Sequence, residues 1–470
     1  MPTNTPHLDR RDMLKSFAAG TALWPTATEA KQQRATPVKQ PNILYIHSHD
    51  TGRQLQPYGK AVLTPNLQKL ATEGILFRNA HSAAPTCSPS RASLLSGQCP
   101  HSNGMLGLAH RGFSMNDYRK HILHTLRGSG YTSILGGLQH IAKDPNVIGY
   151  DQILHAGGTH VAQVAPNVVR FLKNPPKQPF FLDVGFFETH RPFLPPGPKD
   201  DDRYNDSATP LPDLPATRRD MAGFQSSART LDQGVGDVLA AFEAAGLAEN
   251  TLVISTTDHG ISFPSMKCNL TRFGTGVSLI MRGPGAFSGG KVTDALISQV
   301  DIFPTLCELL EIQPPAWLQG KSFLPVVQGK TREINDQVYA EVTYHAAYEP
   351  KRSVCSRRWN YIRHFGGRDT PVLPNCDDGL SKSVWLEYGW RDRPVAPEQL
   401  YDLIFDPNET HNLAGDPAFS DARKEMSQKL ESWMETTEDP ILKGPIPAPA
   451  GAEVNDPNGT SPQEKTQHVG

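Results

Sequence analysis

Asn42-Ile43-Leu44-Tyr45-Ile46 is a short apolar run that indicates the class of fold. A run of this length is typical of a strand buried on both faces of a sheet. Similar runs recur at residues 131–135, 180–186 and 252–257. Residues 217–246 place apolar side chains three and four positions apart, which predicts a helix with one apolar face that stops at Gly246. This alternation predicts an α/β fold with a mixed or mostly parallel sheet between layers of helices.

Polar residues follow each of the four predicted strands. In open α/β sheets, reactive side chains gather where strands end. We therefore expect a polar cluster at one edge of the sheet. Its candidate members are His49, Asp50, His140, His190, Asp258 and His259.

Length and composition limit the classes of protein. The chain has 470 residues, more than one hydrophobic core usually organises, so we expect one large and one small domain. Its 46 basic and 48 acidic residues give a formal net charge of −2, which indicates neither a nucleic-acid partner nor a membrane surface. No run of about 18 apolar residues is present, so no membrane span is predicted. The six cysteines contain no CxxC pair, which argues against a zinc knuckle or a disulfide scaffold and leaves one or two disulfides open.

The two ends of the chain differ from its middle. Arg10 and Arg11 precede a weakly apolar stretch that ends in small residues, a pattern that resembles twin-arginine signals. We therefore predict a signal peptide over residues 1–30 and export to the periplasm or the extracellular space; a disordered basic leader is the alternative. Residues 443–470 are rich in Pro, Gly, Asn and charged residues without apolar periodicity, which predicts a disordered tail.

Cys87-Ser88-Pro89-Ser90-Arg91 leads into a short predicted helix and Gly97. This stretch resembles the signature around the catalytic cysteine of the sulfatase family. In that family the cysteine is oxidised to formylglycine, whose hydrated aldehyde attacks sulfur. The resemblance implies that a formylglycine-generating enzyme modifies Cys87 during maturation. A buried structural thiol is the alternative for a cysteine considered alone.

The resemblance covers nearly the whole chain after the predicted signal. It implies an alkaline-phosphatase-like sandwich, in which a large, mostly parallel sheet flanked by helices carries a smaller C-terminal antiparallel sheet. Leu400-Tyr401-Asp402 resembles part of the family's C-terminal hallmark. We expect a catalytic domain over residues 38–335 and a C-terminal subdomain over residues 336–442. The polar segments 345–352 and 375–390 are candidates for loops over a substrate, although surface loops without that role are commoner.

The resemblance also implies one metal site. The family uses an Asp-Asp pair after the first strand and a later Asp-Asn pair. Asp50 and Asp258 match these patterns, whereas His49 stands in place of a carboxylate and His259 in place of an amide. With Cys87, these residues are the predicted ligands. Family precedent favours Ca²⁺. The two imidazoles could shift the site toward Mn²⁺ or Zn²⁺, because nitrogen ligands suit transition metals, and Mg²⁺ is a further alternative.

The resemblance assigns further catalytic roles. Arg91 is expected to hold the formylglycine hydroxyl and a sulfate oxygen, His190 to protonate the leaving atom, and His140 to assist sulfate release. Lys267 matches a basic position that grips sulfate, but Leu138 stands where the family usually has a lysine. Outside this constellation, such histidines are more often structural and such lysines solvated.

Asp232-Gln233-Gly234-Val235-Gly236 and residues 260–265 resemble the sulfamidase branch of the family, the heparan N-sulfatases. The preferred substrate is therefore a sulfated carbohydrate with N-sulfoglucosamine of the heparan type. Three alternatives stay open: an arylsulfatase-like O-sulfatase acting on another sulfated glycan, a phosphonate or phosphoester hydrolase of the same superfamily, and a catalytically dead glycan-binding relative. Whether the chain forms an oligomer is also left open.

Overall fold

β1 (Asn42–Ser48) lies near the middle of a nine-stranded sheet in this computed structural model, which describes residues 40–469. It pairs in parallel with β5 (Phe180–Gly185) on one side and with β6 (Thr251–Thr257) on the other. Every residue of these three strands is buried, which the continuous apolar runs predict.

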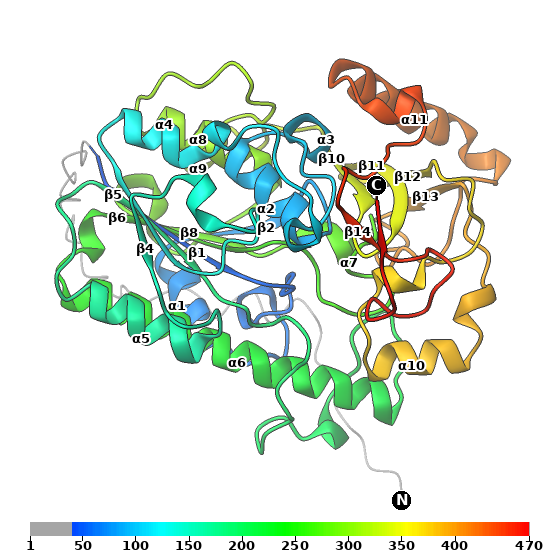
Figure 1. Ribbon diagram of the computed structural model, residues 1–470, viewed down its shortest axis with the longest axis horizontal. Coiled ribbons are helices and arrows are strands. Elements are labelled where there is room, and N and C mark those ends of the chain that lie inside the picture. Colours follow the sequence, from blue (N-terminus) through cyan, green and yellow to red (C-terminus); the bar gives the residue numbers. More distant parts are fainter. Residues whose placement is uncertain (1–39, 470) are drawn as a thin grey trace, which may run out of the picture. The chain divides into compact units, whose positions relative to one another are not determined.

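The sheet is mixed, and its strands run in the order β4-β3-β5-β1-β6-β8-β2-β7, with β9 also paired to β2. The half from β4 to β6 is parallel, whereas β8 is antiparallel to both β6 and β2. The predicted sheet flanked by helices is therefore confirmed (Figure 1). The other strands are β2 (Ile75–His81), β3 (Thr132–Gly137), β4 (Gln152–Leu154), β7 (Gly276–Val277), β8 (Leu279–Arg282) and β9 (Lys291–Ser298).

Helices cover both faces of this sheet. Successive side chains of a strand point to opposite faces, so an apolar strand needs a helix layer on each side. Leu44 and Ile46 of β1 pack into one cluster with the first helix layer, and Ile43 and Tyr45 pack into another with the second. Each fully buried side chain of this size contributes about 1.5–3 kcal/mol. The first layer contains α1 (Pro65–Glu73), α5 (Val161–Phe171) and α6 (Pro215–Ala244); the second contains α2 (Cys87–Ser96), α4 (Ile122–Gly128), α8 (Ile302–Leu309) and α9 (Leu324–Val327).

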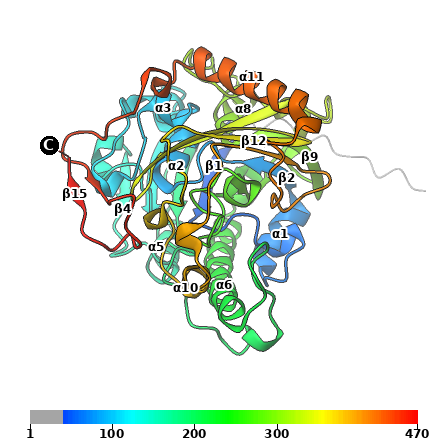
Figure 2. The ribbon, with the colours of Figure 1, turned by 90° about the vertical axis from the view of Figure 1, so that its right-hand side faces the viewer.

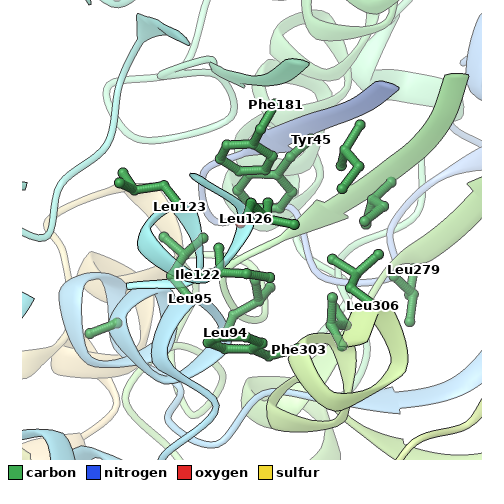
Figure 3. Close-up of a cluster of buried hydrophobic side chains, with 14 of the residues drawn as sticks. Tyr45, Leu94, Leu95, Ile122, Leu123, Leu126, Phe181, Leu279, Phe303 and Leu306 are labelled. Carbon is green, nitrogen blue, oxygen red and sulfur yellow. The ribbon is translucent and has the colours of Figure 1, made fainter. Parts of the chain in front are cut away.

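The second layer is drawn in Figure 3. There Tyr45 and Phe181 of the sheet gather with Leu94 of α2, Leu126 of α4 and Phe303 of α8. Side chains from strands and helices far apart in the sequence thus form one core. This core fixes the position of α2, whose first residue is Cys87.

The 30-residue α6 is the helix predicted over residues 217–246. It begins at Pro215, because proline suits the first helical position, where its missing N–H has no partner to lose. Gly246, beyond its end, has a φ of 68°, a left-handed conformation that favours glycine.

A second, four-stranded antiparallel sheet follows, in the order β10-β11-β12-β13. Its strands are β10 (Gln337–Tyr344), β11 (Tyr348–Ser356), β12 (Trp359–His364) and β13 (Glu398–Asp402). α11 (Ser420–Thr436) lies along it and packs Met426 and Leu430 against Val354 and Tyr361 (Figure 2). The smaller antiparallel sheet is thus confirmed. Residues 345–352 belong mostly to the β10–β11 hairpin rather than to a loop. The remaining helices are α3 (Pro100–Asn103), α7 (Arg272–Thr275) and α10 (Leu380–Glu387).

The C-terminal segment differs from the predicted disordered tail. β14 (Glu453–Val454) pairs with β15 (Gln467–His468), and Ala452 is buried in the main core. Arg111 donates a 2.6 Å hydrogen bond to Asn455 Oδ1. These long-range contacts order a segment whose local composition favours disorder.

Three further predictions concern the signal, a membrane span and the disulfides. The predicted signal, residues 1–30, lies outside the described residues. Within residues 40–469, no helix has the length and apolar character needed to cross a bilayer. All six cysteines are unpaired, so neither of the two disulfides left open by the sequence is formed.

Candidate active site

The polar residues predicted at the strand ends come together at one edge of the large sheet. His49 and Asp50 follow β1, Asp258 and His259 follow β6, and Cys87 begins α2. One donor atom from each of these five buried residues lies within 4.8 Å of the others. We call this set the ligand cluster.

Short contacts link the carboxylates and imidazoles of the ligand cluster. His49 Nδ1 lies 2.7 Å from Asp50 Oδ1 and 3.1 Å from Asp258 Oδ2. His259 Nε2 lies 3.2 Å from Asp50 Oδ1 and 3.7 Å from Asp258 Oδ2. The other ring nitrogen of His259, Nδ1, donates to Gly260 O, so Nε2 turns its lone pair toward the cluster.

Cys87 faces the same point. Its Sγ lies 3.4 Å from His259 Nε2 and 3.9 Å from Asp50 Oδ1. Burial raises the pKa of the Cys87 thiol well above its usual value. An unmodified thiol here is therefore neutral, and a neutral thiol is a poor nucleophile.

Arg91, one helical turn after Cys87, lies behind the carboxylate of Asp258. Its Nη2 donates to Asp258 Oδ2 at 2.9 Å and to Ser48 O at 2.8 Å, and its Nη1 contacts His47 Nδ1. Burial opposes the charge on Arg91, but Asp258 raises the net pKa of the guanidinium. In this structure, Arg91 therefore holds Asp258 in place.

Lys267 supplies the second buried cation. Its Nζ donates to Asp50 Oδ2 at 2.8 Å and to Asp377 Oδ2 at 2.7 Å, and lies 3.4 Å from His190 Nε2. Burial opposes its charge, but the two carboxylates raise its pKa well above the usual value. Lys267 is therefore charged. Leu138 follows β3, donates its backbone N–H to Gly185 O and adds no charge.

The two histidines predicted to act on the leaving group lie at the outer side of the ligand cluster. His190 is 23% exposed, and its ring centroid is 4.5 Å from that of His49. Its Nδ1 donates to Arg191 O, which leaves Nε2 toward Lys267 and Asp50. The ring centroid of His140 lies 5.5 Å from that of His49, and its Nε2 forms a hydrogen bond with His110 Nδ1. Burial and the neighbouring His49 and His110 lower the pKa of His140, so its imidazole is neutral.

Three residues of this site were not predicted. Asp377 lies just before α10, inside the segment 375–390 that was a candidate substrate loop, but no local signal marks it as a partner of Lys267. His110 lies in the short 3-10 helix Ala109–Arg111, and no signal in the sequence marks its contact with His140. His47 could have been found, because it lies next to the end of β1, where polar residues of an open α/β sheet gather.

The donor set of the ligand cluster fits a divalent cation. Its nitrogen and oxygen donors are 2.7–3.7 Å apart, and adjacent ligands of one ion with bonds of about 2.0–2.4 Å have similar spacing. Burial lowers the pKa of His49 to about 3, so its imidazole is neutral, as a metal ligand requires. Two carboxylates and two imidazoles could therefore hold one metal ion.

Comparisons with known proteins find relatives in both sequence and fold. Residues 41–312 match the family model described as Sulfatase, and residues 272–373 match the model described as N-sulphoglucosamine sulphohydrolase, C-terminal. The N-sulphoglucosamine sulphohydrolase of Homo sapiens is 31% identical, over 86% of this chain and 92% of that protein. An ulvan-active sulfatase of Formosa agariphila is 29% identical, over 87% and 83%.

Among solved structures, one described as a complex with its substrate D-glucosamine-2-N,6-O-disulfate is similar in fold. Its TM-score is 0.66 at 18% identity, and the match covers 86% of this chain and 99% of that chain. At this identity the likeness concerns the fold.

Proposed function

This chain belongs to the sulfatase family, and from that membership we propose that it removes sulfate from a sulfated sugar, with N-sulfoglucosamine of the heparan type as the preferred substrate. The 31% identity to human N-sulphoglucosamine sulphohydrolase and the match to the C-terminal model of that enzyme support this substrate class. The observation that carries the proposal is the balance of charge in the buried site.

The buried site has a deficit of positive charge. The pKa values of Asp50, Asp258 and Asp377 are lowered, because nearby cations outweigh the opposing effect of burial, so three carboxylates are ionised. Apart from the neighbouring histidines, Lys267 and Arg91 are the cations that contact these carboxylates among the described residues. A divalent cation together with one singly charged sulfuryl group would bring the total to neutrality, which a buried site favours.

Two groups implied by the family would supply the reactive chemistry. Formylglycine at position 87 would supply a hydrated aldehyde as the nucleophile, which a neutral buried thiol cannot replace. A divalent metal would neutralise charge on the sulfuryl oxygens, held by His49, Asp50, Asp258 and His259. We propose Ca²⁺ on family precedent; the two imidazoles keep Mn²⁺ and Zn²⁺ as alternatives, and Mg²⁺ is a further one.

The chain's own residues then orient and protonate the substrate. The ammonium of Lys267 lies at the site between two carboxylates. It can donate a further hydrogen bond to a sulfuryl oxygen. His190 offers Nε2 as the proton donor to the leaving atom, because its Nδ1 is committed to Arg191 O. His140, neutral and beside His49, can accept a proton during sulfate release. Arg91 fixes Asp258 through its 2.9 Å bond.

A specific contact disfavours the phosphoester alternative. Asp50, His190 and Asp377 could together hold a second cation, but Lys267 Nζ lies against all three. The lysine therefore takes the place of a second metal ion, and a single metal suits a singly charged sulfate better than a doubly charged phosphate monoester. O-sulfatase action on another glycan remains the second candidate, favoured by the likeness to the ulvan-active sulfatase and by Leu138.

The twin-arginine-type segment supports a further part of the proposal, export to the periplasm or the extracellular space. A sulfated polysaccharide substrate would be met there. The intact family motif at Cys87 also argues against a dead glycan-binding relative.

The test is a substrate panel with Cys87→Ala and the control Cys307→Ala, which removes another buried thiol. We expect wild-type protein to release sulfate from N-sulfoglucosamine, and Cys87→Ala to lose at least about 1000-fold in kcat/KM. Peptide mass spectrometry should show residue 87 lighter than cysteine. Full turnover by Cys87→Ala would overturn the proposal, and preference for an O-sulfated sugar would select the second candidate.

A further inference from the structure

A cavity of about 440 Å³ lies apart from the ligand cluster and shares no residue with it. It is formed by the loop after β1, by β2, by α7 and by the segment after β13. Its lining contains four cationic residues and no carboxylate. They are Arg53, Lys60, Arg78 and Arg272.

The arginines of this cavity are poorly neutralised. Arg53 donates through Nη1 to the backbone oxygen of Arg78 at 2.9 Å, and no described carboxylate lies within 4.0 Å of it. Arg78 has one distant contact, 3.8 Å, with the exposed Asp294. Burial and the neighbouring Arg272 lower the pKa of Arg53 to about 10, so its charge is disfavoured without an anion.

Arg272 has an unsatisfied donor at the same place. Its buried Nε has no hydrogen-bond partner in the described chain. The nearest carboxylate, Glu409, lies 4.0 Å from Nε and instead accepts from the backbone N–H of Arg272 at 2.7 Å and from Asn360 at 2.6 Å. A buried guanidinium donor without an acceptor is costly, and an incoming anion would satisfy it.

We propose that this cavity binds a tetrahedral oxyanion, either free sulfate or phosphate or a sulfate group carried by a sugar, through Arg53, Arg78 and Arg272. Guanidinium groups match such anions because they donate two parallel hydrogen bonds. The cavity is larger than one ion needs, and its volume lies within the usual range for ligand pockets. A sulfated sugar unit could therefore also bind there.

The cavity touches the backbone that follows the ligand cluster. Gly52 and Ile261 line it, and the N–H of Gly52 donates to the backbone oxygen of His259 at 2.9 Å. Gly52 has a φ of 55°, so this turn depends on glycine. An occupant of the cavity therefore contacts the chain two residues beyond Asp50 while it remains outside the ligand cluster.

Selenate, a sulfate analogue with an anomalous X-ray signal, locates the site directly. Crystals of the whole protein soaked in sodium selenate should show an anomalous peak among Arg53, Arg78 and Arg272. A peak only at the ligand cluster, or none, would overturn the proposal whatever the enzyme's activity.

Calorimetry with sodium sulfate at constant ionic strength measures the same site in solution. The double variant Arg78→Gln/Arg272→Gln changes partly exposed side chains and leaves Arg53 in place, so we expect it to fold and to bind at this site at least about tenfold more weakly. Arg119→Gln, an exposed arginine paired with Asp117, is the matched control and should bind as wild type. Equal binding by all three proteins would overturn the proposal.

Two further probes identify the source of the anion. Binding of sulfate and phosphate alone, with no gain from a sugar, would assign a free oxyanion. Tighter binding of 6-O-sulfated N-acetylglucosamine, lost in the double variant, would assign a sulfated glycan.

Discussion

Two buried polar clusters in this molecule are built from the same residue types but differ in their balance of charge. One is the candidate active site. The other, which we call the junction cluster, joins α3 to the small sheet. It consists of His101, Glu341, Arg352 and Asp439.

Every charge of the junction cluster has a partner. Glu341 Oε2 lies 2.8 Å from His101 Nδ1 and 2.9 Å from Arg352 Nε, and Asp439 Oδ2 lies 2.6 Å from the same Arg352 nitrogen. Burial opposes the charge on His101, but Glu341 raises its pKa to about 11, so two cations face two carboxylates.

The candidate active site lacks that balance, since its three carboxylates face two fixed cations. Buried charges are tolerated when they are paired. The balanced cluster can therefore serve stability alone, whereas the proposed cation would restore the balance of the other. This contrast predicts that equivalent charge removals will affect activity in one place and stability in the other.

Asp50→Asn should have the largest effect, about a 10,000-fold loss in kcat/KM for sulfate release, because it removes a candidate ligand and a partner of Lys267. Metal content measured by mass spectrometry should fall with it. Lys267 keeps Asp377, so the thermal midpoint should change little. Wild-type metal content with activity within tenfold of wild type would contradict the contrast.

Glu341→Gln should lower the free energy of unfolding by about 3–5 kcal/mol, because it leaves Arg352 and His101 with one carboxylate between them. Urea unfolding measures this change. Turnover per folded molecule should stay close to wild type. A loss of activity without a loss of stability would contradict a purely stabilising role for Glu341.

The pH dependence of stability sharpens the same point. Burial raises the pKa of Glu341, but His101 and Arg352 outweigh this effect and lower the pKa from 4.5 to about 2. A lowered carboxyl pKa stabilises the fold above the unfolded value, and this contribution, roughly 3 kcal/mol, is lost as pH falls from about 5 to about 2. Thermal scans across this range should show the loss in wild type and a smaller loss in Glu341→Gln. Identical acid profiles would refute the assignment.

Local pattern was sufficient for the strands and for most of the site. The apolar runs at β1, β3, β5 and β6 predicted the sheet, and the residues that follow them proved to share one edge. That prediction works because parallel strands all end on the same side. Four members of the ligand cluster therefore follow from chain order, whereas Cys87 was identified by the family resemblance.

Contacts between distant segments lay beyond such reasoning. Asp377 reaches Lys267 from a segment with no periodicity, 110 residues away. The C-terminal segment is ordered by Ala452 and Asn455, although its composition predicts disorder. The role of Arg91 toward sulfate stays a prediction; in this structure its side chain contacts Asp258, Ser48 and His47.

The order of residues along the chain determined the kind of sheet, its active edge and the cysteine motif, because hydrophobic periodicity and strand direction are local properties. Only the folded molecule decided which charges are paired, which are left in deficit and which arginines line a cavity without a carboxylate. Charge balance in a buried place depends on side chains brought together from segments far apart, and no local pattern encodes those distances.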